Sequence, residues 1–138
     1  MRFTQQPLLD ASARLGQSAA MARLSIRIYL DEHRHALGPG MMELLEGVAE
    51  HGSIRKSAAA MGMSYRKAWL LIRNMQESFG GEIVTTTIGG NAGGGARLTA
   101  LGKTLLASYR RIESGAARAA QAEIKTLLAL AKRRGKTK

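Results

Sequence analysis

Residues 53–79, SIRKSAAAMGMSYRKAWLLIRNMQESF, predict a pair of helices joined by a tight turn. Ser53 and Ser64 are each placed to cap a helix, because a serine hydroxyl accepts a hydrogen bond from an otherwise unpaired amide of the first turn. Ala58 is small enough to let the helices cross closely, and Gly62 adopts at little cost the positive φ that a sharp turn requires. The segment therefore predicts a helix-turn-helix.

The second of these helices has an apolar face and a basic face. Its apolar residues follow helical spacing and form one buried stripe, which consists of Ala68, Leu71, Ile72, Met75 and Phe79. Rotation by about 100° per residue places Arg66, Leu70 and Arg73 opposite the stripe, with Lys67 and Asn74 beside them. No acidic residue lies between Glu50 and Glu77. We interpret this helix as the recognition helix of a DNA-binding domain; the alternative is a solvated basic face on a small helical hairpin.

The composition of the 138-residue chain favours one folded domain with an extension, and an anionic partner. Its hydrophobic fraction is 45% and its formal net charge is +11, and nucleic acid is the commonest partner of so basic a protein. A membrane surface would also attract this charge, but aromatic residues make up only 4%, and no apolar run approaches the ~20 residues of a spanning helix. We therefore expect no membrane partner. The N-terminus lacks the pattern of a secretory signal, which predicts a cytoplasmic protein.

Neither a metal site nor an enzyme active site is expected. The chain has no cysteine, and His33 and His35 lack the carboxylates or thiols that would complete a metal cluster. Residues 102–104, GKT, resemble the end of a phosphate-binding loop, but such a loop needs an earlier glycine where this chain has Arg97. No paired carboxylates or nucleophile–base set accompany the glycine-rich residues 89–95. We expect no cofactor and no catalytic residue, and nucleotide binding is the alternative.

The remaining chain predicts a mainly α fold, a winged helix-turn-helix with a small β wing and a long C-terminal dimerisation helix. Alternating apolar residues predict a strand from Leu24 to Asp31, and a helix follows Pro39 and ends at Gly52. Two strand-like segments, 83–88 and 96–99, enclose the glycine-rich loop and predict the wing. The expected divisions are an N-terminal arm (1–20), the winged helix-turn-helix (21–98), the dimerisation helix (99–134) and a basic tail (135–138).

The predicted helix 99–134 is too long for one small domain to cover. It would extend about 50 Å, and its exposed apolar face needs a partner, of which a second copy is the simplest. The residues expected at this contact are Leu105, Ile112, Ala116, Ala119 and Leu127. Gly115 weakens helical continuity and is the expected position of a bend. The alternative is a helix folded back on its own domain.

The sequence resembles the DNA-binding domain of ModE-type molybdate-responsive regulators, whose winged helix-turn-helix is close to that of LysR-type regulators. The resemblance rests on residues 52–54 (GSI), 60–69 (AMGMSYRKAW), 89–99 (GGNAGGGARLT) and Gly102, and extends from about Leu37 to Glu113. It implies a homodimer held by long helices, recognition helices in successive major grooves, and regulation of molybdenum uptake or cofactor genes. Asn91 stands where the family's wing usually has a basic residue. Full-length members carry a C-terminal molybdate-binding module that this sequence lacks, so no oxyanion effector is expected on this chain.

The expected contacts to double-stranded DNA come from the helix-turn-helix and the wing. Arg66, Lys67 and Arg73 are expected at base edges and phosphates, and Leu70 either at a thymine methyl group or in an apolar contact without DNA. The helix termini and the wing would add Ser53, Arg55, Lys56, Ser64, Tyr65, Asn74, Asn91 and Arg97. These contacts predict a dimeric sequence-specific regulator on a pseudo-palindromic site. The alternative is an architectural protein that binds DNA with low specificity.

Overall fold

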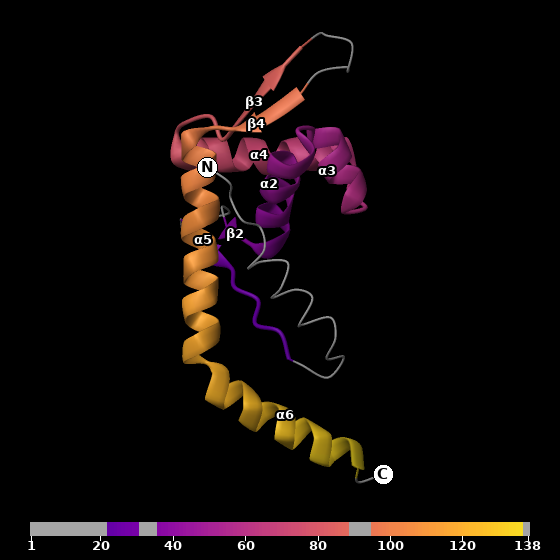
Figure 1. Ribbon diagram of the computed structural model, residues 1–138, viewed down its shortest axis with the longest axis vertical. Helices are drawn as coiled ribbons and strands as arrows, with labels where there is room; N and C mark the ends of the chain where they lie inside the picture. Colours follow the sequence, from indigo (N-terminus) through magenta and orange to yellow (C-terminus); the bar gives the residue numbers. More distant parts are fainter. Residues whose placement is uncertain (1–21, 31–35, 89–94, 137–138) are drawn as a thin grey trace. The chain divides into compact units, whose positions relative to one another are not determined.

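The computed structural model of the chain describes residues 22–30, 36–88 and 95–136, and these residues are mainly helical (Figure 1). Residues Ser25–Ser114 form one compact unit, and Gly115–Lys138 belong to a second unit. The helices are α2 (Pro39–His51), α3 (Ile54–Ala60), α4 (Tyr65–Phe79), α5 (Ala100–Ala119) and α6 (Gln121–Lys136), and the strands are β1 (Ile28–Tyr29), β2 (Ala36–Leu37), β3 (Val84–Thr87) and β4 (Gly95–Leu98).

The strand predicted over Leu24–Asp31 is shorter than expected. Only Ile28 and Tyr29 pair, antiparallel, with Leu37 and Ala36. The alternation of burial does extend beyond the ladder, since Ile26 and Ile28 are half-buried while Arg27 and Tyr29 are exposed. The ladder ends early because β2 is followed within two residues by Pro39, which starts α2. The histidines considered for a metal site, His33 and His35, lie outside the described residues.

Helix α2 begins and ends as its sequence predicts. Pro39 occupies its first turn, where the missing N–H costs nothing. Gly52 ends it in the left-handed conformation, with φ 65°, and its N–H donates to the Val48 carbonyl at 2.9 Å. The apolar residues of the predicted stripe, Met41, Leu44, Leu45 and Val48, are all buried. They supply the centre of the core against which α3 and α4 pack.

A close approach holds α3 against α2. A Cβ atom at Gly47 would lie 2.7 Å from the Ser57 Oγ atom, so only glycine fits there without movement. Ala58 is 1% exposed, as its predicted role at the helix crossing requires. These small residues let the helix-turn-helix sit directly on α2.

The wing is an antiparallel pair of strands, with Val84 opposite Leu98 and Thr87 opposite Gly95. Figure 1 shows β3 and β4 on one side of α2 and α4. The Ala96 N–H donates to the Gly52 carbonyl at 2.8 Å, which fastens β4 to the corner between α2 and α3. The predicted strands 83–88 and 96–99 are each displaced or shortened at their ends. The loop between them, residues 89–94 with Asn91, lies outside the described residues.

Two expectations about the predicted helix 99–134 were wrong. The helix is not continuous, because Ala120 separates α5 from α6, and Gly115 lies inside α5 instead of at a bend. A helical glycine costs only about 1 kcal/mol, which a 20-residue helix tolerates. No local feature of the sequence explains an interruption at an alanine.

None of the helices described is long and apolar enough to cross a membrane.

Leu105 was also wrongly placed at the dimer contact. It is 8% exposed and belongs to the core of its own unit, together with Tyr109 from the same helix. The compact unit consequently continues past the expected boundary at residue 98 and ends at Ser114. The first part of α5 is therefore a structural element of the helix-turn-helix unit.

Candidate nucleic-acid interface

The turn between α3 and α4 has the geometry that its sequence predicts. Ser53 and Ser64 each accept a hydrogen bond, at 3.1 Å, from the backbone N–H of Lys56 and Lys67 respectively. Gly62 has φ 68°. The Met63 N–H then donates to the Ala58 carbonyl at 2.9 Å, which closes the turn. Both predicted caps are confirmed, and the cap at Ser64 leaves the remaining N-terminal amides of α4 available to donate hydrogen bonds to a phosphate oxygen.

Helix α4 has the two faces that its sequence predicts. Ala68, Ile72 and Met75 are buried, and Leu71 and Phe79 are half-buried against the same core. On the opposite face the side chains are exposed: Arg66, Lys67, Leu70, Arg73 and Asn74. Leu70 is 49% exposed on this face. The core fixes the inner face of α4, and the helix presents cations and amide groups outward.

Arg73 has one acidic neighbour. Its Nε atom lies 3.5 Å from an Oε atom of Glu77, one helical turn away, and the two side chains are 72% and 57% exposed. Ion pairs this exposed contribute about 0.3–0.5 kcal/mol, so Arg73 is free to exchange the carboxylate for a phosphate. The basic face is thus pre-oriented at this position but not neutralised.

Tyr65 joins α3 to the start of α4 through a contact that sequence reasoning missed. The Arg55 guanidinium carbon lies 4.6 Å from the centre of the Tyr65 ring, and the Trp69 ring meets the same ring edge-on at 6.3 Å and 89°. Cation–π contacts at exposed sites contribute about 0.5–1 kcal/mol. Arg55 and Tyr65, both proposed from sequence as DNA contacts, are therefore brought together. Trp69 is half-buried against Tyr65 and the core.

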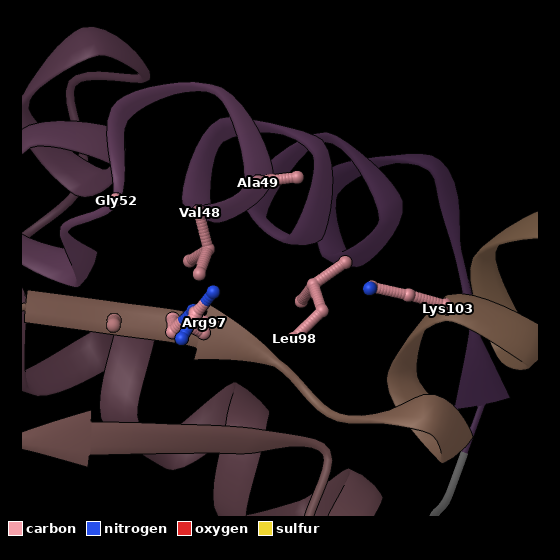
Figure 2. Close-up of a pocket in the computed structure, with 7 residues that line it drawn as sticks. Val48, Ala49, Gly52, Arg97, Leu98 and Lys103 are labelled. Carbon is pink, nitrogen blue, oxygen red and sulfur yellow. The ribbon is translucent and has the colours of Figure 1, made fainter. Parts of the chain in front are cut away.

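A shallow groove separates α2 from β4, and two cations flank it (Figure 2). Val48, Gly52, Ala96 and Leu98 are among its lining residues, with Arg97 and Lys103. In Figure 2 the Lys103 side chain points toward Leu98. Arg97 was predicted as a wing contact and is exposed on β4, opposite Thr85. Lys103, the lysine of the glycine-lysine-threonine sequence, was not predicted as a contact.

The glycine of that sequence has a packing role. A Cβ atom at Gly102 would clash with the Ile83 carbonyl oxygen, so the start of α5 rests directly on the backbone before β3. Thr99 reinforces the contact, because its hydroxyl lies 2.6 Å from the Glu82 carbonyl oxygen and accepts from the Gly102 N–H at 3.1 Å. This glycine is required by helix packing, and no phosphate loop is needed to account for it.

The other predicted site residues are spread more widely. Ser53 is half-buried as a cap, and Lys56 is exposed on α3. Of the expected dimer contacts, Ile112 is 50% exposed and Leu127 is 64% exposed, Ala119 is exposed, and Ala116 is half-buried. Asn91 is outside the described residues. Within the described part of the chain there is no group of three or more His, Asp or Glu residues that could hold a metal ion.

Part of the chain is similar to a known family of helix-turn-helix proteins. Residues 40–103 match the family described as bacterial regulatory helix-turn-helix protein, lysR family. This range runs from α2 through the helix-turn-helix and the wing to the start of α5. The predicted winged helix-turn-helix is confirmed in the described residues, which are mainly helical with a small β wing, and its sequence is similar to the lysR family.

Several relatives show the predicted resemblance to ModE. The "Molybdenum transport protein ModE" of Herbaspirillum seropedicae is 37% identical over 79 residues, which cover 57% of this chain and 29% of that protein. The "Molybdenum-pterin-binding protein MopB" of Rhodobacter capsulatus is 36% identical over 66% of this chain and 34% of its own length. The "DNA-binding transcriptional dual regulator ModE" of Escherichia coli (strain K12) is 38% identical over 51% and 27%. The matched segment thus spans about a third of these curated relatives.

Proposed function

We propose that this chain is a homodimeric, sequence-specific transcriptional regulator that reads double-stranded DNA with α4. The observation that carries the proposal is the division of α4 into a face buried on the core and a face of exposed cations. A helix of this kind fits the major groove, and the cap at Ser64 orients its first turn. The similarity of residues 40–103 to the lysR family of regulatory helix-turn-helix proteins supports the same role.

Individual roles follow from position on the helix. Arg66 and Lys67, in the first turn of α4, would contact base edges, since the N-terminal residues of a recognition helix are those that reach the bases. Arg73 and Asn74 are farther along α4 and would contact phosphates. Leu70, which lies between Lys67 and Arg73, would meet a thymine methyl group. Lys56 and Arg97 would contact the DNA backbone with their side chains. Ser53 and Ser64 would contribute through the backbone amides of the helix starts that they cap, and the Arg55–Tyr65 pair would line the entry to the groove.

The proposed divisions follow from this assignment. Residues 21–98 would form the DNA-binding domain, assisted by the anchored start of α5, and residues 1–20 and 135–138 would form an arm and a basic tail. The exposed apolar residues Ile112 and Leu127, with Ala116 and Ala119, support a helix-mediated dimer. Two-fold symmetry then requires half-sites about 34 Å apart or a multiple of that distance.

The genes controlled would concern molybdenum, or the chemically similar tungsten, in uptake or cofactor synthesis. The names of the relatives support this proposal, since they refer to molybdenum transport, molybdenum-pterin binding and transcriptional regulation. Mapping the genomic sites bound by the protein tests it directly. Binding sites upstream of genes unrelated to these metals would exclude this part of the proposal.

Replacement of Arg66 tests the DNA-reading role. Arg66→Ala should lose roughly 1–3 kcal/mol of discrimination between a selected site and random duplex, because one guanine contact disappears. Arg111→Ala is the matched control, since it removes the same charge from an exposed position on α5. An architectural binder would behave differently: wild type and both variants would bind every duplex alike, with a steep salt dependence. That result would overturn sequence-specific reading.

A further inference from the structure

Arg110 of α5 is held between two carboxylates. Its Nε atom lies 2.6 Å from an Oε atom of Glu46 on α2, and one terminal nitrogen lies 2.8 Å from an Oε atom of Glu113 on α5. The three side chains are between 18% and 29% exposed, so water screens these pairs far less than it screens Arg73 and Glu77. A planar guanidinium with two partners fixes direction as well as distance.

The preceding residue anchors the same helix to a different element. Tyr109 is 1% exposed, and its hydroxyl donates to the Ile26 carbonyl oxygen, just before β1, at 2.5 Å. Adjacent residues of a helix point about 100° apart, so Tyr109 and Arg110 attach α5 to the rest of the unit in two different directions. Burial raises the pKa of Tyr109, and although burial alone would lower the pKa of Arg110, its bonds to Glu46 and Glu113 outweigh that effect and raise it. Both groups therefore keep their hydrogen-bonding forms at neutral pH.

A third anchor lies at the start of α5, where Gly102 rests on the Ile83 carbonyl. Gly102 and Arg110 are about 12 Å apart along the helix at 1.5 Å per residue. Contacts at these two separated points, Gly102 and Arg110, define the direction of the helix axis. The contacts of Tyr109 and Arg110, which point in different directions, also fix the rotation of the helix about that axis. The exposed Ile112 is two residues beyond Arg110 in the same compact unit, so its position relative to α4 is fixed by these contacts.

We propose that Arg110, clamped between Glu46 and Glu113, is the positioning residue that sets the spacing of DNA half-sites. It would do so by fixing the angle between α5, which carries the dimer contact at Ile112, and α2, on which the recognition helix packs. The inference rests on the proposed dimeric, sequence-specific function. The hydrophobic effect is not directional, so apolar packing fixes the angle of a helix less sharply than a charged hydrogen bond does. A fork of two charged hydrogen bonds is directional, and Arg110 supplies one.

The test varies half-site spacing in duplexes that contain two copies of the selected half-site. Adding one base pair moves a half-site by about 3.4 Å and turns it by roughly a tenth of a helical turn. Wild type should prefer its best spacing over neighbouring spacings by about tenfold or more. Arg110→Gln and Glu46→Gln should reduce that preference to about threefold or less, while affinity for a duplex with one intact half-site stays within about twofold.

Arg111→Gln is the matched control. It removes the same charge from the next residue of α5, whose side chain is exposed and contacts only the Ser108 hydroxyl, at 3.4 Å, among the interactions described. It should keep the wild-type spacing preference. A control that relaxes spacing as much as Arg110→Gln would overturn the clamp, because general loss of charge would then explain the effect.

The outcomes separate the clamp from the function on which it rests. A wild type with a sharp spacing preference that both variants retain would overturn the clamp and leave the proposed regulator intact. A wild type with no preference for any sequence would overturn the regulator and the clamp together. If Arg110→Gln loses single half-site binding through unfolding, Glu46→Gln decides the matter, since it leaves Arg110 paired with Glu113.

Discussion

Helices α4 and α5 both carry arginines beside an apolar stripe, yet the two helices use them in opposite ways. On α4 the arginines are exposed, and Glu77, the carboxylate beside Arg73, is itself largely in water. On α5 Arg110 is mostly buried between Glu46 and Glu113. The role of an arginine in this protein therefore depends on the carboxylates within its reach. Where they are absent or solvated, the charge is available to a phosphate.

If only the inner face of α4 packs against the rest of the protein, substitutions on its two faces should differ in their effect on stability. Ile72→Ala should destabilise the protein by about 2–5 kcal/mol, because removing a fully buried side chain leaves a cavity in the core. Leu70→Ala, on the outer face of the same helix, should change stability by no more than about 0.5 kcal/mol. Urea unfolding of both variants measures the difference. Similar losses would mean that the outer face is packed against something in solution.

The next prediction compares the contributions of Arg110 and Arg73 to stability. Arg110→Gln should destabilise the protein by about 1–2 kcal/mol, less than the 3–5 kcal/mol of a fully buried pair because some water reaches these groups. Arg73→Gln should cost less than about 0.5 kcal/mol. Thermal unfolding at low and high salt measures both, and the Arg110 effect should depend less on salt. Equal losses would contradict the assignment of different roles.

Much of α4 could be predicted because its determinants are local. The spacing of Ala68, Ile72 and Met75 and the cap at Ser64 lie within one segment, and each obeys a rule that needs no knowledge of the fold. The same holds for Gly52 at the end of α2. The helix-turn-helix and the exposed basic face could therefore be predicted from local sequence alone.

The surroundings of α5 could not be predicted in this way, because they depend on distant residues. Arg110 and Glu46 are 64 residues apart, and Tyr109 is 83 residues from Ile26. Helical periodicity identified Leu105 as apolar but could not say whether its own core or a second copy would cover it. The length of β1 likewise depended on β2, a partner that the sequence pattern did not indicate.

A smaller effect concerns the first turn of α4. Ser64→Ala should cost about 1 kcal/mol, because the Lys67 N–H loses its side-chain acceptor, whereas Ser64→Gly should cost only a few tenths. Both variants keep every cation of α4, so DNA affinity should fall only as far as the first turn frays. Measuring stability and DNA binding for the pair tests whether the cap orients the basic face. A large loss of affinity in Ser64→Gly, with stability unchanged, would instead indicate a direct contact from the hydroxyl.

The smallest effect tests whether the Arg73–Glu77 pair restrains the basic face. Glu77→Gln should lower stability by only about 0.3–0.5 kcal/mol, because both side chains are exposed. Affinity for DNA should rise, since a carboxylate that repels phosphates is gone and Arg73 is released. The slope of affinity against salt should steepen by no more than about one, the contribution of a single phosphate contact.

Glu123→Gln on α6 makes the same charge change at another exposed position and is the control. If both variants raise affinity equally, net charge alone governs binding and Arg73 has no special position on the interface. If only Glu77→Gln does so, a carboxylate one turn from an arginine weakens DNA binding even when it is solvated. Arg73 and Arg110 would then differ only in how strongly a glutamate pairs with them. Burial strengthens an arginine–glutamate pair until the arginine is no longer available to DNA.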